Sequence, residues 1–103
     1  MKKSIVVATG MLALMSAGPL VAGDAAAGKA KSATCAACHG PTGISINPMW
    51  PSLAGQQEVY LAKQMTAFRD GTRSDPMMGP MAVALSDADI ADLAAFYAAQ
   101  SCK

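Results

Sequence analysis

The feature that most restricts this 103-residue chain is the motif Cys-Ala-Ala-Cys-His at residues 35–39, which contains two of its three cysteines and its only histidine. On an α-helix, Cys35, Cys38 and His39 stand at i, i+3 and i+4, so their side chains project from one face. This spacing suits covalent haem, because two thiols can bond the two vinyl groups at the porphyrin edge while the adjoining imidazole lies under the iron. The motif therefore predicts a haem attachment site.

Two other kinds of site use the same residue types. A Cys-x-x-Cys pair can form a redox disulfide of the thioredoxin kind, but that fold needs a βαβ pattern, and the sequence shows no strand pattern. A structural zinc site needs a fourth ligand beside Cys35, Cys38 and His39, and Cys102 can supply it. Zinc leaves the apolar loops and the cluster of methionines unexplained, so haem attachment is the favoured interpretation.

The first 22 residues have the pattern of a cleavable secretory signal. Lys2 and Lys3 form a positively charged N-terminal region, and an uncharged stretch of eleven residues runs from 5 to 15. Small residues at 22 and 23 are typical of the cleavage site that follows. Eleven apolar residues are too few to cross a bilayer as a helix. We therefore predict export to the bacterial periplasm, removal of residues 1–22, and a single domain over residues 23–103 with no transmembrane segment.

Removal of this signal would leave 81 residues with six basic and seven acidic side chains, a net charge of −1. A chain of this length buries too little apolar surface to be stably folded by itself, and its stability usually depends on a disulfide, a metal or a cofactor. Its five aromatic residues fill only part of a core, so we expect a cofactor to fill the rest. The small net charge provides no basic field for a nucleic acid, and no nucleic-acid partner is expected.

The chain has the pattern of an all-α fold with three main helices. They are predicted at about residues 25–38, from 56 to 70, and from 86 onward. Asp24 is a typical N-cap for the first helix, and Ser86 with Asp89 resembles a capping box at the start of the third. Gly- and Pro-rich segments, 40–55 and 71–85, are predicted as loops. Loops of this length in so small a domain suggest a functional site.

These features resemble the class I c-type cytochromes, specifically the short periplasmic type whose halves also occur in dihaem cytochromes. The resemblance covers essentially residues 23–101. Besides the haem motif it rests on Gly28, seven residues before the first haem cysteine, and on blocks at 51–56, 60–61, 68–71 and 85–90. It implies the cytochrome c fold, in which three main helices and loops wrap around one covalently bound haem c.

The resemblance also implies the iron ligands, which are His39 on one side and a methionine of the second loop on the other. In the family pattern this methionine lies eight residues before the Ser that opens the last helix, which from Ser86 points to Met78; Met81 and then Met77 are the alternatives. A thioether opposite an imidazole raises the reduction potential, and a six-coordinate iron has no open site for a substrate. We therefore expect an electron carrier and not an enzyme.

Several other residues are expected to support the haem, each with an ordinary packing or surface role as the alternative. Gly28 is where the first helix can approach the last, near Leu93 and Phe96. Pro48 and neighbouring backbone carbonyls are candidate acceptors for the His39 ring nitrogen that faces away from iron. Trp50 and Tyr60 are expected to pack around the haem, and Arg69 and Arg73 to pair with its propionates.

Electron donors and acceptors are expected to meet this chain transiently where the haem edge is accessible, between the loops around residues 35–38 and 77–81. The chain is predicted to be either a diffusing carrier or the fixed haem subunit of a periplasmic oxidoreductase. Cys102 is the odd thiol once Cys35 and Cys38 hold the haem. We expect a monomer, with a disulfide dimer through Cys102 as the alternative.

Overall fold

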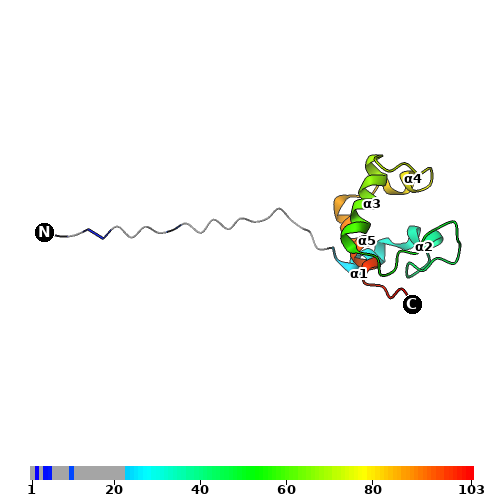
Figure 1. Ribbon diagram of the computed structural model, residues 1–103, viewed down its shortest axis with the longest axis horizontal. Coiled ribbons are helices and arrows are strands. Elements are labelled where there is room, and N and C mark those ends of the chain that lie inside the picture. Colours follow the sequence, from blue (N-terminus) through cyan, green and yellow to red (C-terminus); the bar gives the residue numbers. More distant parts are fainter. Residues whose placement is uncertain (1, 3, 6–9, 11–22) are drawn as a thin grey trace.

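The protein is described by a computed structural model that covers residues 2, 4, 5, 10 and 23–103 (Figure 1). The predicted signal segment, residues 1–22, therefore lies almost wholly outside the described residues. Five helices follow, namely α1 (Ala25–Lys31), α2 (Ala33–His39), α3 (Glu58–Asp70), α4 (Met78–Ala82) and α5 (Asp87–Ala98). The described residues contain no strand, so the predicted all-α class is confirmed. None of the described helices is long and apolar enough to cross a membrane.

The first predicted helix is divided in two at Ser32. Its start agrees with the prediction, because the Asp24 carboxylate accepts hydrogen bonds from the backbone N–H groups of Ala26 and Ala27. At Ser32 the side-chain hydroxyl donates to the carbonyl oxygen of Lys29 over 2.8 Å. A serine that bonds to a preceding helix carbonyl competes with the regular backbone ladder. The chain therefore turns at this residue, and the haem motif lies on a separate short helix, α2.

Between the other two predicted helices the structure adds one. Helix α3 begins at Glu58 and ends before Gly71, whose φ of 83° is the left-handed conformation that glycine adopts at low cost. The following segment is predicted as a loop but contains the short helix α4. Pro80 is the third residue of α4. The first backbone N–H groups of a helix have no acceptor within the helix, so a proline, which has no N–H, can occupy this position.

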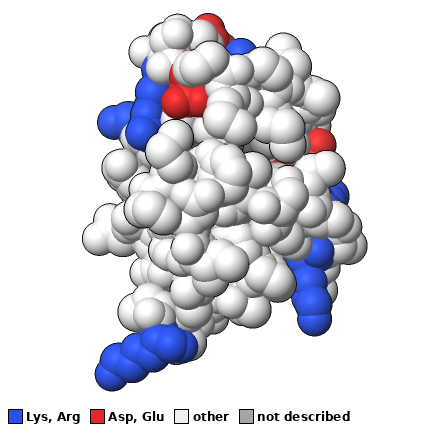
Figure 2. Space-filling model, turned by 90° about the vertical axis from the view of Figure 1, so that its right-hand side faces the viewer, with Lys and Arg blue, Asp and Glu red and all other residues white. Residues whose placement is uncertain are grey.

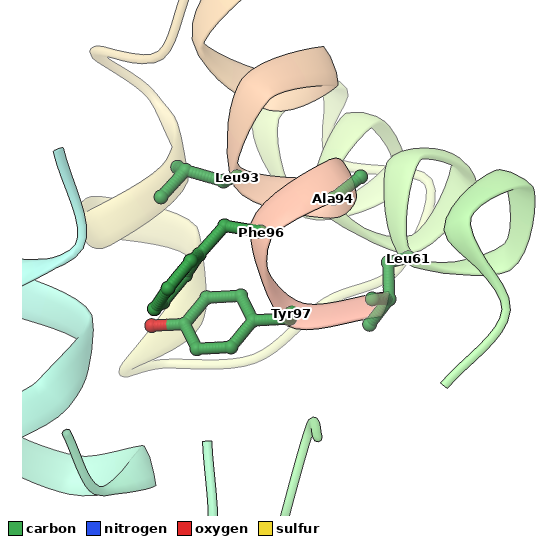
Figure 3. Packing of buried hydrophobic residues seen from close by; sticks show 5 residues of the cluster. All are labelled: Leu61, Leu93, Ala94, Phe96 and Tyr97. Carbon is green, nitrogen blue, oxygen red and sulfur yellow. The ribbon is translucent and has the colours of Figure 1, made fainter. Parts of the chain in front are cut away.

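Helix α5 supplies most of the hydrophobic core. Its start is the predicted capping box, in which Ser86 and Asp89 each accept a hydrogen bond from the other's backbone N–H over 3.0 Å. Its buried face packs against α3, and the cluster in Figure 3 consists of Leu61 from α3 with Leu93, Ala94, Phe96 and Tyr97 from α5. The helix is thus both the last element in the sequence and the centre of the fold.

Helices α1 and α5 cross at Gly28. A Cβ atom at this position would lie 2.0 Å from the carbonyl oxygen of Asp92 and 2.8 Å from the Cβ of Phe96. Only glycine allows so close an approach, so the role expected of Gly28 is confirmed. Beside the crossing, Lys31 pairs with Asp89 at 2.9 Å and with Asp92 at 2.6 Å. We call α1, α3 and α5 the helical frame. Helices α2 and α4 both lie on its right-hand side in Figure 1, where α4 packs beside α3 and α2 lies below it beside α1.

Candidate haem site

The three side chains of the haem motif lie on α2, and the helix ends immediately after them. Gly40 closes α2 with a φ of 85°, and its backbone N–H donates to the carbonyl oxygen of Ala36. A Cβ atom here would lie 2.0 Å from the carbonyl oxygen of Ile44. Glycine therefore lets the chain turn sharply after His39 and fold back along the side of that residue.

His39 is buried, with 7% of its surface exposed, and its orientation is fixed by one hydrogen bond. Its Nδ1 atom lies 2.7 Å from the carbonyl oxygen of Pro51. A carbonyl only accepts, so Nδ1 carries the proton, and Nε2 is left with a lone pair for a metal. The prediction centred on Pro48, which is three residues too early in the loop.

The fold of the loop explains why Pro51 is the acceptor. The backbone N–H groups of Leu53 and Ala54 both donate to the carbonyl oxygen of Gly43, at 2.6 and 3.0 Å. These bonds bring the end of the loop back beside its beginning, next to the C-terminus of α2. The residue that meets His39 thus depends on pairing across the loop, which the local sequence does not reveal.

The two motif cysteines are not joined in a disulfide. Cys35 and Cys38 are partly exposed, and Cys35 packs against the hydrophobic core cluster. Cys102, the fourth ligand in the zinc interpretation, is also free and is exposed near the C-terminus. Within the described part of the chain, no three His, Cys, Asp or Glu side chains are grouped as metal ligands. The described residues therefore do not assemble the zinc site considered above.

The three methionines of the second loop differ in burial. Met77 and Met81 are 54% and 46% exposed, whereas Met78 is partly buried at the first position of α4. The backbone N–H groups of Met77 and Met78 both donate to one carboxylate oxygen of Asp75, each over 2.8 Å. These two bonds lower the pKa of Asp75 below its usual value. Asp75 thus fixes the backbone from which Met78 projects.

Sequence reasoning did not find the role of Asp75. A signal was present, because an aspartate followed by proline often starts a turn in which its side chain binds backbone N–H groups two and three residues later. The sequence analysis predicts this segment only as a loop that contains two prolines.

The two arginines expected to bind propionates have other partners. Arg69 donates to the Asp87 carboxylate at 2.7 Å and to Asp70 at 3.0 Å, and so ties α3 to the start of α5. Arg73 donates to the side-chain oxygen of Gln64 at 2.7 Å and covers the ring of Phe68 at 4.5 Å. The structure therefore places both guanidinium groups in contacts within and around the frame.

A shallow groove of about 510 Å³ runs between α2 and the loop that follows it. Trp50 lines it, while Tyr60 is 46% exposed at the start of α3. The other lining residues are Ala36, Ala37, Cys38, Gly40, Pro41, Ile44, Ile46, Asn47 and Pro48, none of them charged. Trp50 thus shares this groove with Cys38, and Tyr60 is largely at the surface.

The absence of charge extends beyond the groove. Residues 32–57 and 76–86 contain no Asp, Glu, Lys or Arg, although residues 23–103 contain 13 such side chains. We call these two segments, which include α2 and α4, the uncharged side. Figure 2 views the molecule from this direction, and charged side chains lie along its margins while its middle is free of them. The haem motif and the loop methionines all lie in the uncharged side.

One buried polar atom has no partner. The Tyr97 side chain is 2% exposed, and its hydroxyl makes no hydrogen bond, the only such buried side-chain oxygen or nitrogen among the described residues. Burial and the neighbouring Cys35 thiol raise the pKa of Tyr97, so the hydroxyl keeps its proton. Three features fit a haem attached at this motif: a buried donor without a partner beside Cys35, two cysteines one helical turn apart that form no disulfide, and an imidazole held through one nitrogen only.

Comparisons with known proteins agree with this chemistry. A protein-family model described as "Cytochrome c" matches residues 25–99. Cytochrome c-554(548) of Halomonas halodenitrificans is 51% identical over 82 residues, which are 77% of this chain and 99% of that protein. Cytochrome c4 of Pseudomonas aeruginosa is 54% identical over 79 residues, 77% of this chain but only 39% of the relative. The chain thus matches the whole of the first protein and less than half of the second.

Two further proteins bear on the fold and on electron transfer. The crystal structure of reduced recombinant cytochrome c4 from Pseudomonas stutzeri superposes with a TM-score of 0.74 at 43% identity, over 78% of this chain and 47% of that chain. A thiosulfate dehydrogenase electron acceptor of Stutzerimonas stutzeri is 45% identical over 67 residues, 62% of this chain and 31% of the relative. Together these similarities account for the helical fold and for the motif on α2.

Proposed function

Since the chain belongs to the cytochrome c family and is a haem c electron-transfer protein, we propose that it is a periplasmic monohaem carrier of single electrons, exported by removal of residues 1–22. In this proposal Cys35 and Cys38 hold the haem through thioethers, and His39 and Met78 are the axial ligands of its iron. The observation that carries the proposal is the orientation of the His39 imidazole. Its Nδ1 is held by the Pro51 carbonyl, which leaves Nε2 available to a metal, and the two cysteines of the same motif form no disulfide.

The residues around the proposed site have separate tasks. When bound, the haem supplies a one-electron couple at its iron. Pro51 sets the tautomer and the plane of the His39 ring, and Asp75 fixes the backbone of Met78. Ligands held from outside the site change position little between two oxidation states, which favours fast electron exchange. With His39 and Met78 both bound to the iron, no axial position would remain for a substrate, so the proposed role is that of a carrier and not of an enzyme.

We also propose that redox partners dock on the uncharged side. The segments that would frame the haem carry no charged residue, and their exposed side chains include Ile46, Met49 and Met81. Charged side chains on a partner would lose hydration there without gaining an opposite charge. This supports a small, transient contact with an apolar partner surface, formed with little electrostatic steering.

The alternative is that the chain is a fixed haem subunit of a periplasmic oxidoreductase. The relative named as an electron acceptor of thiosulfate dehydrogenase supports this alternative, whereas the match to nearly all of cytochrome c-554(548) supports a free carrier. Gel filtration of a native periplasmic extract separates them. A free carrier elutes as a small protein of the monomer's size, and co-elution with a larger enzyme contradicts the free-carrier proposal.

The test of the proposed site combines peptide mapping with carbon monoxide binding. Haem should be found on the peptide that contains Cys35 and Cys38, and the reduced protein should bind no carbon monoxide because both axial positions are filled. Met78→Ala should bind carbon monoxide, while Met81→Ala, the matched control, should not. Haem absent from that peptide, or carbon monoxide bound by the unchanged protein, contradicts the proposal.

A further inference from the structure

The orphaned hydroxyl of Tyr97 is held in one place. The carbonyl oxygen of Tyr97 accepts a hydrogen bond from the backbone N–H of Gly55 at 2.9 Å. Gly43 packs against the ring so closely that a Cβ atom there would lie 2.7 Å from it. The ring also meets that of Phe96, with centroids 5.0 Å apart. The side chain therefore has no room to swing its hydroxyl out to solvent.

The hydroxyl points toward the segment that carries the first haem cysteine. Figure 3 shows it directed away from α5, toward the blue-green ribbon formed by α1 and α2. Cys35 packs against the core cluster that includes Tyr97. Ser32, the other polar side chain in this region, is buried and donates its proton to the carbonyl oxygen of Lys29. It lies near enough to Tyr97 to lower the pKa of that hydroxyl, but no hydrogen bond of ordinary geometry joins the two side chains. A buried donor without an acceptor costs free energy comparable to a lost hydrogen bond, and so calls for an explanation.

We propose that Tyr97 is a positioning residue of the haem site, whose hydroxyl donates a hydrogen bond to the Cys35 sulfur once that sulfur is bonded to haem. A thioether sulfur is a weak acceptor with no proton of its own, so in a hydrogen bond with it the Tyr97 hydroxyl is the donor. This bond would join the centre of the core, on α5, to the first point of haem attachment. The inference rests on the proposed function, since it requires haem on Cys35.

Vibrational spectroscopy of the haem-loaded protein tests the bond directly. Resonance Raman spectra contain a carbon–sulfur stretching band of the thioethers. We expect this band to shift in Tyr97→Phe, and to shift in D2O for the unchanged protein but not for Tyr97→Phe. Tyr60→Phe, at a half-exposed tyrosine of α3, is the matched control and should leave the band and its isotope shift unchanged. A band that responds neither to D2O nor to Tyr97→Phe overturns the inference.

A double-mutant cycle gives an independent readout. Tyr97→Phe should raise the equilibrium constant for unfolding about two- to tenfold in the protein with Cys35, as expected for one lost hydrogen bond. In a Cys35→Ala background, where haem is held by Cys38 alone, the same change should have less than about a twofold effect. Equal effects in both backgrounds overturn the inference. Peptide mapping separates the proposed function from the role of Tyr97. If haem is absent from Cys35, both are overturned. If haem is on Cys35 but the effects of the Tyr97 and Cys35 substitutions are independent, only the role of Tyr97 is overturned.

Discussion

The helical frame and the uncharged side are stabilised by different kinds of interaction. The frame is stabilised by close helix packing at Gly28 and by ion pairs such as Lys31 with Asp89 and Asp92. The uncharged side has no ion pair available to it, because it has no charged residue, and its loops are ordered by glycine turns and backbone hydrogen bonds. Charged side chains thus stabilise the frame, and at the proposed site Asp75 acts on the backbone N–H groups of Met77 and Met78. Changes in the frame should therefore alter stability, and changes in the uncharged side should alter haem ligation and partner contact.

The largest effect is expected where the frame is most tightly packed. Gly28→Ala places a methyl group 2.0 Å from the Asp92 carbonyl oxygen and should lower the free energy of unfolding by about 3 kcal/mol, because backbone must move to admit it. Gly79→Ala, on α4 of the uncharged side, is the control, since a Cβ there meets nothing within 4 Å. Denaturant unfolding measures both, and an unaffected Gly28→Ala protein would show that the helices do not cross as described.

Acid should weaken the frame as the carboxyl groups paired with Lys31 take up protons. Hydrogen bonding to Lys31 lowers the pKa of Asp89 from 3.8 to about 2 and also lowers the pKa of Asp92. A carboxyl whose pKa is lower in the folded state contributes stability that is complete above its ordinary pKa and is lost as the pH falls through the folded value. Stability should therefore decline from about pH 4 to pH 2. Lys31→Met should be less stable at pH 7 and show a shallower decline in acid-unfolding experiments, and an unchanged profile would contradict the role of the ion pairs.

Asp75→Ala should affect ligation more than the fold. It removes the acceptor for the backbone N–H groups of Met77 and Met78, so Met78 should leave the iron more readily. Added imidazole should bind the ferric protein several-fold more tightly as a result, which a spectral titration measures. Asp75→Asn keeps an acceptor oxygen and should behave much like the unchanged protein. Equal imidazole affinities for the alanine and asparagine variants would contradict this role.

The smallest effect concerns charge on the uncharged side. Ala37→Lys puts one positive charge beside the haem motif and should speed reduction by the anion hexacyanoferrate(II) about three- to tenfold at low ionic strength, an increase that added salt should remove. Ala99→Lys, at an exposed position after α5, is the control and should change the rate much less. If both variants respond alike, the uncharged side is not the surface through which electrons pass.

The sequence predicted the features that depend on neighbouring residues. The N-cap at Asp24, the capping box at Ser86 and the haem motif each lie within a few positions of the sequence. Both caps are where they were expected, and the motif is helical as expected, although on the separate helix α2. Gly28 was placed correctly because the family pattern supplied the long-range contact. The fold class therefore followed from local signals together with that pattern.

Features that depend on distant parts of the chain, or on a side chain that competes with the helix backbone, were missed. The break at Ser32 arises from a side-chain bond to Lys29 that competes with a helix of good propensity. Pro51 meets His39 only because the loop pairs with itself through Gly43. The hydroxyl of Tyr97 stands beside Cys35 through packing of α5, 62 positions further along the chain. Periodicity and spacing carry no information about such contacts.

The most direct test of the account is the ferric absorption spectrum in the far red, where a thioether bound to haem iron gives a weak band. The unchanged protein should show this band, Met78→Ala should lose it while keeping covalent haem, and Met77→Ala and Met81→Ala should retain it. If the band persists in Met78→Ala, or is absent from the unchanged protein, then Met78 is not the ligand and the proposed electron carrier with His39 and Met78 on its iron is contradicted.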